Sequence, residues 1–440
     1  MAKYKILILI YLISVLSSSI ASFFGINVQY LLRVPFLNLR WIDVAILFIL
    51  INFLYSLNYN KIENNGILIT LCFIYLIFET FQLLKSWQLN DLQSQVSWFI
   101  CTLSFFILID LSSFPIDQEK IIKFLKLFAL AGAVVLIISN TITFYSFLKG
   151  NIITNKFEDR VLLNVEGQRE SIYTAVLLSY VYTFSLYFLQ KGSKLWEKAI
   201  FLGAILSIYL ALVTSFSRGD LATIILISII HIVVFSRKVM QGIIRVFAMI
   251  LLLVSFYFMF GSTLREKGYD PVEKITQTVE FAADVDNPGW DKGRSVSRSF
   301  ALSAWERNLW TGVGYDVLFH WGLPEEVATA HNFVITSLFH RGIIGTAMYL
   351  LILLLLFKNA IWLWLLLGKD NSYQNDMFKL LVIASFFWLI PFWNQEVIWE
   401  KYSLSIQFLY LGLITNIYMQ KSAEERLTQE TITESEYIPV

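Results

Sequence analysis

The sequence predicts an all-α, polytopic membrane protein of about twelve transmembrane helices, with one large extracytoplasmic loop that contains short helices. Apolar side chains make up 57% of the 440 residues, only 15% are charged, and the mean hydropathy is +0.63. A soluble domain could not bury that much apolar surface. The apolar runs have roughly the 17–25 residues that a helix needs to cross a bilayer. They are residues 6–23, 42–57, 66–84, 96–112, 125–146, 171–189, 198–215, 220–235, 242–260, 342–366, 378–395 and 403–419.

The first of these runs could instead be a secretory signal, because Lys3 and Lys5 precede it. The apolar stretch continues to Phe24 and further spans follow, which favours a membrane helix. Cys72 and Cys101 both lie in predicted spans, so we expect neither a disulfide framework nor a thiolate metal site. The net charge of +1 gives no reason to expect a nucleic-acid partner.

The distribution of basic residues predicts the orientation of the chain. If the N-terminus is cytoplasmic, the short cytoplasmic segments hold sixteen Lys and Arg residues and the opposite segments hold nine. The positive-inside rule favours this orientation. The long loop 262–330, the loop 147–170 and the link 215–220 then lie on the extracytoplasmic face.

Four regions follow from this layout. They are the N-terminal membrane helices at 1–200, a core at 201–367 that includes the loop 262–330, the C-terminal membrane helices at 368–420, and a cytoplasmic tail at 421–440. The tail is acidic and has no hydrophobic period, so we expect it to be disordered.

Arg218 stands in the stretch SFSRGD, which links two predicted spans. An arginine at a membrane edge is often an anchor whose guanidinium reaches the interface. Arg218, however, lies on the face where positive charge is sparse. We therefore favour an anionic ligand, because a guanidinium offers a planar fork that matches phosphate oxygens.

The long loop contains the stretch DKGRSVSRSFALSAWERNLWTGVGYD. No Pro or Gly interrupts it from Arg294 to Asn308, and apolar residues recur at near-helical spacing, which predicts a helix that stops at Gly312 and Gly314. Arg294 and Arg298 are four residues apart and would share one helix face. The loop as a whole carries a net charge of −4, so particular arginines would have to recognise an anion.

The stretch HNFVITSLFHRGIIG begins at His331 and leads into an apolar run. On a continuous helix with about 100° per residue, Gly342 and Gly345 lie near His331, whereas His340 points to the opposite face and Arg341 to a flank. A span at 342–366 puts Arg341 at its outer boundary. His331 could be a hydrogen-bonding helix cap, but arginines are predicted on the same side of the membrane, and histidine readily takes a proton near neutral pH.

No metal or cofactor is expected from these features. The histidines lack carboxylates at ligand spacing. The acidic pair Asp284 and Asp286 is similar to the metal-binding pair of soluble glycosyltransferases, but a solvated acidic turn is the favoured interpretation because no α/β domain accompanies it.

Three of these stretches together resemble the O-antigen ligase and polymerase family of bacterial membrane glycosyltransferases. They are TSFSRGDLA, GRSVSRSFALSAWERNLWTGVG and HNFVITSLFHRGIIG, in the family's order, with the large loop between them. Leu309 stands where the family often has proline. His340 and Arg341 stand where an acidic or apolar pair is more usual.

The resemblance implies a reaction, its partners and its residues. The donor would be a glycan on undecaprenyl pyrophosphate, and the acceptor hydroxyl would belong to a lipid, such as lipid A-core, or to another glycan. The enzyme would lie in the bacterial inner membrane, surrounded by membrane lipids, with its active site at the extracytoplasmic face. His331 would be the catalytic base, with Asn332 beside it as a supporting residue, and Arg218 and Arg294 would bind the pyrophosphate. From their own positions in the sequence, Arg298 and Arg341 are further candidate supporting residues.

Other functions remain open on the sequence. A polymerase of O-antigen or exopolysaccharide and a protein O-oligosaccharyltransferase share the same pattern. A transporter of lipid-linked sugars belongs to a different class and would place charged residues deep inside several spans. Glu79 and Asp110 are the main candidates for such residues.

Overall fold

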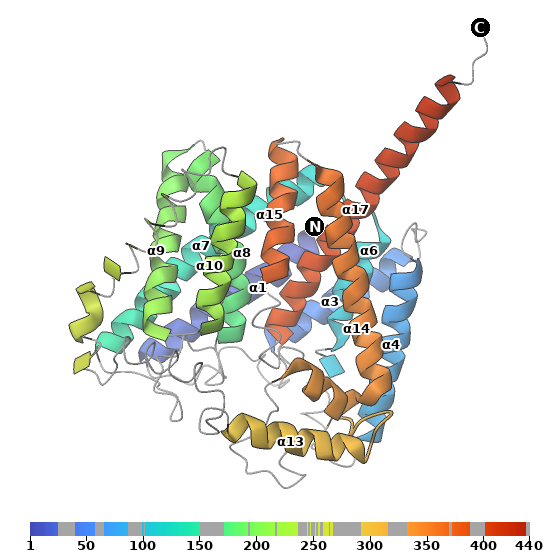
Figure 1. The fold of residues 1–440 in the computed structure, drawn as a ribbon, viewed down its shortest axis with the longest axis horizontal. Helices are drawn as coiled ribbons and strands as arrows, with labels where there is room; N and C mark the ends of the chain where they lie inside the picture. The colour runs from blue at the N-terminus through green and yellow to red at the C-terminus, as the bar shows by residue number, and fades with distance from the viewer. Residues whose placement is uncertain are drawn as a thin grey trace.

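In a computed structural model, the chain folds into a bundle of helices, and the described residues contain no strand (Figure 1). The structure describes residues 1–24, 40–57, 66–86, 99–100, 102–149, 171–191, 194–215, 218–235, parts of 244–266, 292–315, 332–368, 372–387 and 401–436. The predicted all-helical class is confirmed for these residues.

Helices from both halves of the chain build the bundle. The first half contributes α1 (Ala2–Phe24), α3 (Trp41–Leu57), α4 (Gly66–Lys85), α6 (Phe105–Ser113), α7 (Gln118–Leu148), α8 (Ser171–Lys191), α9 (Leu195–Ser215) and α10 (Arg218–Phe235). The second half contributes α13 (Lys292–Glu306), α14 (Phe333–Leu367), α15 (Tyr373–Phe387) and α17 (Lys401–Glu436). Helices suit such apolar sequences, because a helix satisfies its backbone groups internally where water is absent.

Four helical stretches in the described residues are long and apolar enough to cross a membrane: Gly66–Lys85, Gln118–Tyr145, Leu195–Leu212 and Phe333–Leu367. Two shorter apolar helices, Trp41–Leu57 and Thr223–Phe235, accompany them. Most predicted spans coincide with a helix in whole or in part, but the span 242–260 lies largely outside the described residues. The number of spans therefore stays a prediction.

Several helices differ from their predicted bounds, α6 and α17 among them. α6 has only 9 residues, Phe105–Ser113, whereas the apolar run 96–112 predicted a full span. α17 continues to Glu436, so the expectation of a disordered tail is wrong for residues 421–436. Residues 421–436 contain no Pro or Gly, and Lys421 pairs with Glu424 three residues on at 2.9 Å, which favours a helix even without an apolar face.

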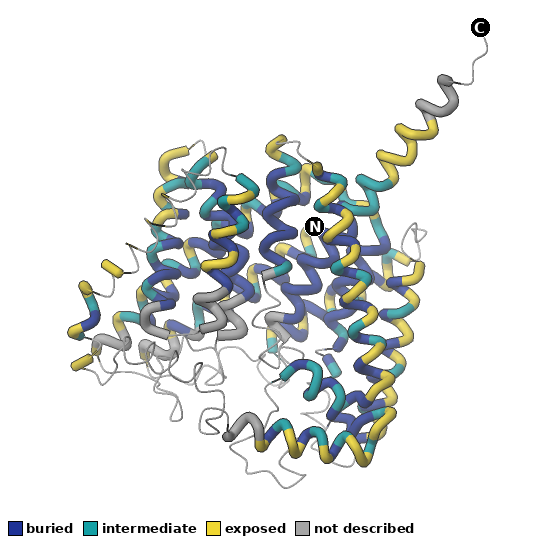
Figure 2. Tube along the Cα trace, viewed as in Figure 1, coloured by how far each residue is buried: buried dark blue, intermediate teal, exposed yellow. Residues whose placement is uncertain are grey.

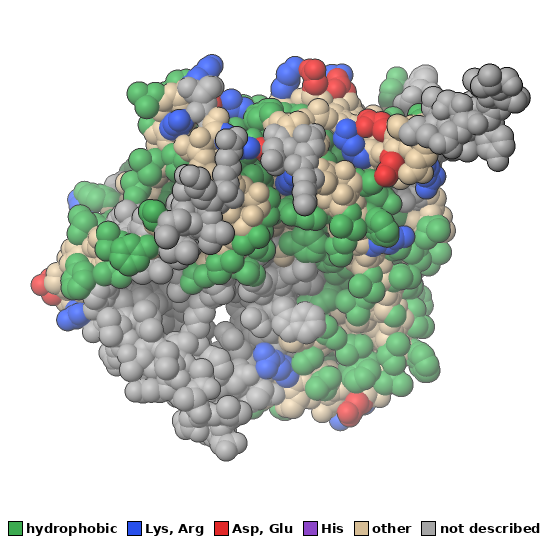
Figure 3. All heavy atoms as spheres, turned by 45° about the horizontal axis from the view of Figure 1, so that its top comes forward, with side chains coloured by type: hydrophobic (Ala, Val, Ile, Leu, Met, Phe, Trp, Pro, Cys, Tyr) green, Lys and Arg blue, Asp and Glu red, His purple; other side chains and the backbone are tan. Residues whose placement is uncertain are grey.

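Burial follows the bundle (Figure 2). One hydrophobic core draws buried residues from α1 through α17, and the end of α17 projects from it with exposed side chains. Hydrophobic side chains form a broad surface below one charged edge (Figure 3). This distribution is typical of a protein whose apolar flank faces lipid.

Polar contacts connect helix termini at one end of the bundle. The contacts involve the starts of α1, α7, α9 and α15 and the ends of α6 and α8. The predicted orientation also places these six termini on one side, the cytoplasmic side. α13 lies across the opposite end, beside the end of α4 and the start of α14 (Figure 1).

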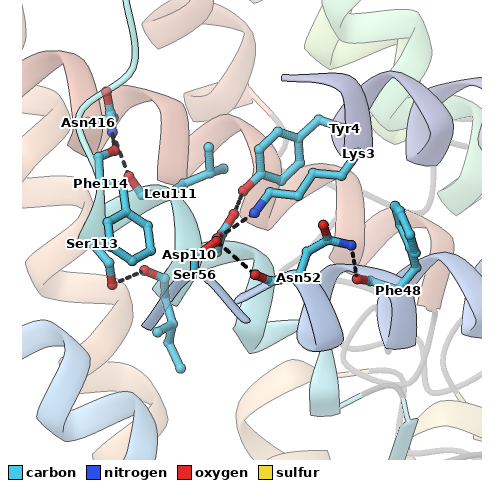
Figure 4. Close-up of polar contacts among 11 residues, drawn as sticks. Lys3, Tyr4, Phe48, Asn52, Ser56, Asp110, Leu111, Ser113, Phe114 and Asn416 are labelled. Atoms are coloured by element: carbon cyan, nitrogen blue, oxygen red, sulfur yellow. Dashed lines mark hydrogen bonds and ion pairs between the residues drawn. The ribbon is translucent and has the colours of Figure 1, made fainter. Parts of the chain in front are cut away.

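Asp110 is the centre of one such contact (Figure 4). Its carboxylate is buried in α6 and accepts hydrogen bonds from Lys3 Nζ at 2.6 Å and from the hydroxyl of Tyr4, both on α1. Nearby, Asn416 on α17 donates to the carbonyl groups of Leu111 and Phe114 at the end of α6. The short helix α6 is thus held by side chains from the first and last helices.

Replacing Asp110 with alanine should destabilise the protein by about 1–3 kcal/mol, because two donors lose a buried acceptor. Thermal unfolding in detergent measures the change. Glu119→Ala is the matched control, because Glu119 pairs with Lys123 at 3.2 Å on an exposed surface and should contribute little. Equal unfolding temperatures for the two variants would contradict the structural role of Asp110.

Candidate functional site

The predicted site residues come from three segments. Arg218 is the first residue of α10, Arg294 and Arg298 lie in α13, and Asn332 immediately precedes α14. α10 ends where its Phe235 ring packs on Tyr187 of α8, near the charged end, so Arg218 lies at the other end of the bundle. α13 and the start of α14 also lie at that end. The structure therefore brings the three segments to one end of the bundle.

Not every predicted side chain is described. His331 lies outside the described residues, and for Arg218 and Arg294 the structure describes the backbone but not the side chain. Asn332 is described and caps α14, because its side-chain oxygen accepts a hydrogen bond from the backbone N–H of Ile335 at 3.1 Å. Arg298 is half-buried on α13.

α13 packs on α14 through small residues. Ala301 and Ala304 are buried in a satellite core with Val313 and Phe339. Val296 and Phe300, whose spacing helped to predict the helix, are 44% and 38% exposed. The short side chains allow α13 to approach the start of α14 closely. The predicted helix is present, but it ends at Glu306, before the predicted stop. Gly312 and Gly314 form a turn beyond it, with φ of 64° and 85°.

The segment from Leu309 to Gly314 is inserted into a break in α14. Gly342, within α14, has φ 61° and ψ −165°, which is not helical. In a regular helix, the N–H groups of Ile343 and Ile344 would bond to the carbonyls of Phe339 and His340. Here, backbone groups of the inserted segment bond instead to these two N–H groups and to these two carbonyl groups.

The four replacement bonds are reciprocal. Ile343 N–H donates to Leu309 O at 3.0 Å, and Ile344 N–H donates to Trp310 O at 3.1 Å. Val313 N–H donates to Phe339 O at 2.8 Å, and Gly314 N–H donates to His340 O at 3.0 Å. All four groups that the break would leave unpaired are satisfied. We call this arrangement, residues 309–315 with the break at Gly342, the junction.

Glycine is required on both sides of the junction. A Cβ atom at Gly342 would lie 2.4–2.5 Å from backbone atoms of residues 310–312, and one at Gly312 would lie 2.5–2.6 Å from backbone atoms of residues 340–342. Positive φ adds a further penalty for any other residue. Gly345 is also at a close approach, since a Cβ there would lie 2.3 Å from Phe78 of α4.

The end of α4 holds the junction from a third side. Gln82 and Lys85 donate hydrogen bonds to the segment at Thr311, with Lys85 Nζ 3.0 Å from Thr311 Oγ1. Ser86 Oγ accepts from the backbone N–H of Tyr315 at 2.8 Å. The junction is therefore fixed by α4 and α14 together.

The break at Gly342 shows that the prediction of side-chain directions from His331 to Gly345, which assumed one continuous helix, does not hold. A constant angle per residue requires one continuous helix, but α14 begins at Phe333, after His331, and is broken at Gly342. Arg341 was expected at the outer boundary. It is instead 2% exposed and its Nε donates to the carboxylate of Glu79 on α4. Its guanidinium thus already has an anionic partner, and its contact with phosphate stays a prediction.

His340 also contributes to the junction. Its Nδ1 lies 2.8 Å from the carbonyl oxygen of Gly314, in hydrogen-bonding geometry. This contact gives His340 a place in holding the inserted segment, which the sequence alone did not indicate.

Sequence reasoning missed most of the residues that hold the junction. Glu79 had a detectable signal, because a carboxylate inside an apolar span needs a buried partner. Arg341 supplies that partner. Tyr315, Gln82 and Lys85 gave no signal, because nothing in the sequence places the end of α4 beside a loop more than two hundred residues later.

Within the described part of the chain, no group of three or more His, Cys, Asp or Glu residues is arranged to hold a metal ion. A shallow depression of about 280 Å³ lies on α13, lined by Ser299, Phe300, Ser303, Ala304 and Arg307. It is shallow and exposed, and we assign no ligand to it.

The fold and these contacts define a multi-pass helical membrane protein with a structured segment across one end of its bundle. Residues 201–350 match the sequence profile of the O-antigen ligase family. This profile suggests an O-antigen ligase or polymerase-type glycosyltransferase that uses lipid-linked glycans. The match covers most of α9, all of α10 and α13, the first part of α14 and the junction. No curated protein matches the chain.

Proposed function

We propose that this protein transfers a glycan from undecaprenyl pyrophosphate to an acceptor hydroxyl at the extracytoplasmic face of the bacterial inner membrane. One observation carries the proposal. The start of α10, the helix α13 and the start of α14 lie at the same end of the bundle, and α13 packs on α14. Arg218 and Arg294 belong to the first two of these segments, and the pair His331–Asn332 directly precedes α14 in the sequence.

The residues have complementary roles in the proposed reaction. His331 takes the proton of the acceptor hydroxyl, whose oxygen attacks the anomeric carbon of the donor sugar. The bond from that carbon to the pyrophosphate oxygen breaks, and the bonding electrons leave with undecaprenyl pyrophosphate. Arg218 and Arg294 stabilise the charge that grows on this leaving group. Displacement from the opposite side inverts the anomeric carbon.

Lipid A-core is the acceptor we favour, which makes the protein a ligase. A polymerase would instead use a second carrier-linked repeat unit, and a protein O-oligosaccharyltransferase would use a protein hydroxyl. Glycan profiles of a deletion strain separate these cases. Loss of a ligase leaves long lipid-linked polymer, loss of a polymerase leaves single repeats, and loss of a protein transferase leaves unglycosylated proteins.

A lipid-linked sugar transporter is less well supported. Its path would need charged groups available to a passing substrate, and Glu79 and Asp110 were the main candidates. Both are buried and engaged, Glu79 with Arg341 and Asp110 with Lys3.

Arg218→Ala and Arg294→Ala should each slow transfer by about a hundred- to a thousandfold, because each removes a donor to the leaving group. The assay follows transfer of a lipid-linked glycan by purified protein. Arg307→Ala is the matched control, since Arg307 is exposed just beyond α13 and lies outside the proposed constellation. Wild-type turnover in folded Arg218 and Arg294 variants would refute the proposal.

A further inference from the structure

Glu79 and Arg341 form a buried ion pair beside the junction. Glu79 on α4 is 0% exposed, and Arg341 directly precedes the break in α14. The other carboxylate oxygen of Glu79 accepts a hydrogen bond from the hydroxyl of Tyr315 at 2.6 Å. Burial raises the pKa of Tyr315, so its hydroxyl stays protonated and donates. One carboxylate thus binds both the broken helix and the inserted segment.

Aromatic rings complete the surroundings of the guanidinium. The Arg341 Cζ atom lies 5.9 Å from the ring centre of Tyr75 on α4 and 6.0 Å from that of Tyr349 on α14. Both distances suit a cation–π contact. Through these rings the cation contacts both α4 and its own helix, which helps to fix where α14 lies against α4.

A buried ion pair adds little net stability, because the loss of hydration offsets the attraction between the charges. Apolar side chains could fill the same space, but they would not define a single arrangement. This pair has directional partners on three segments that are far apart in the sequence. Its distinctive effect is to fix the position of the junction.

The position of the junction affects both parts of the proposed site. On one side, α13 packs through Ala301 and Ala304 on Phe339, two residues before Arg341. On the other side, Arg341 follows Asn332 by nine residues, or about 13 Å along a helix. A shift at the junction would move the arginine-bearing helix relative to the helix start beside His331.

We propose that Glu79 and Arg341 are positioning residues: by fixing the junction to α4, their ion pair aligns α13 with the start of α14 for glycan transfer. This inference rests on the proposed function. It also makes a claim about geometry that can be measured without any activity assay.

The central variant is the double substitution Glu79→Gln with Arg341→Met. It removes both charges together, leaves an amide oxygen to accept from Tyr315, and places an apolar side chain between Tyr75 and Tyr349. It should fold, as judged by size-exclusion chromatography and thermal unfolding. We expect kcat to fall by about ten- to a hundredfold, since small misplacements of catalytic groups are costly, with a much smaller change in KM.

A cross-linking measurement reads the geometry directly. Cysteines at positions 85 and 311 replace Lys85 and Thr311, whose side chains touch in the structure. A short bifunctional thiol reagent should join them efficiently when the ion pair is intact and several times more slowly in the double variant. The two single-cysteine proteins are the controls for reaction at Cys72 and Cys101.

Two further variants sharpen the test. Arg341→Lys keeps the charge but loses the planar donor, so its kcat and cross-linking should lie between those of the wild type and of the double variant. Lys421→Met with Glu424→Gln removes an exposed ion pair on α17 and should change neither quantity. If the double variant does not fold, Arg341→Lys still decides, since wild-type kcat and cross-linking in it would overturn the inference.

The outcomes separate this inference from the proposed function. Wild-type kcat and cross-linking in a folded double variant would overturn the positioning role and leave the function intact. If the Arg218 and Arg294 variants retain full turnover, the function fails, whereas slower cross-linking in the double variant would still support a junction fixed by the ion pair.

Discussion

Replacing His331 with alanine should lower kcat for glycan transfer by about a hundred- to ten-thousandfold, the usual contribution of a general base. The variant should fold normally, because the helix cap that starts α14 is made by Asn332 rather than by His331. Transfer of a lipid-linked glycan by purified protein measures the effect. In the wild type, kcat/KM should fall at acidic pH, because a protonated His331 could no longer accept the proton of the acceptor hydroxyl.

His340→Asn is the matched control for this experiment. Its side-chain amide can keep a hydrogen bond to the carbonyl of Gly314, so the junction should hold and turnover should change little. If His340→Asn lost turnover while His331→Ala kept it, our mechanism would have named the wrong histidine as the base. An unchanged pH profile in a His331 variant that retains activity would likewise rule out its role as the base.

Helix positions were predictable where an apolar run has the length of a bilayer. The run 66–84 became α4 (Gly66–Lys85) and the run 42–57 became α3 (Trp41–Leu57). In both cases hydropathy alone sets the bounds, because the backbone must be helical wherever lipid excludes water.

The sequence was less informative where helix continuity and hydropathy diverge. α6 is shorter than its apolar run, and α17 extends well past its own. Hydropathy reports whether a segment can be buried in lipid. It does not report whether a helix is interrupted within an apolar run or continues into water.

The candidate site was predictable as residues but not as an arrangement. The stretches containing Arg218, Arg294 and His331 gave clear signals from polar residues at span boundaries. The turn at Gly312 and Gly314 was also foreseen, although α13 ends earlier, at Glu306. That this turn enters a break at Gly342 was not foreseen, because the pairing depends on four backbone hydrogen bonds that no side-chain pattern encodes.

Gly342→Ala should destabilise the protein by about 3–6 kcal/mol. An alanine at φ 61° and ψ −165°, a conformation that essentially only glycine adopts, costs about 1–3 kcal/mol. Its Cβ would also meet backbone atoms of residues 310–312 at 2.4–2.5 Å, and these cannot move aside without loss of the four junction bonds, each about 1 kcal/mol. Thermal unfolding in detergent measures the loss. Gly66→Ala is the control, since a Cβ at the start of α4 meets nothing within 4 Å.

A rearrangement of α14 could reduce the destabilisation caused by Gly342→Ala. Alanine favours the α-helix, so α14 could straighten and restore the bonds of Ile343 and Ile344 to Phe339 and His340. The inserted segment would then be expelled, and the thiol cross-link between positions 85 and 311 would be lost along with glycan transfer. If Gly342→Ala instead unfolds at the same temperature as Gly66→Ala and keeps the cross-link, the left-handed conformation of Gly342 is not what maintains the break.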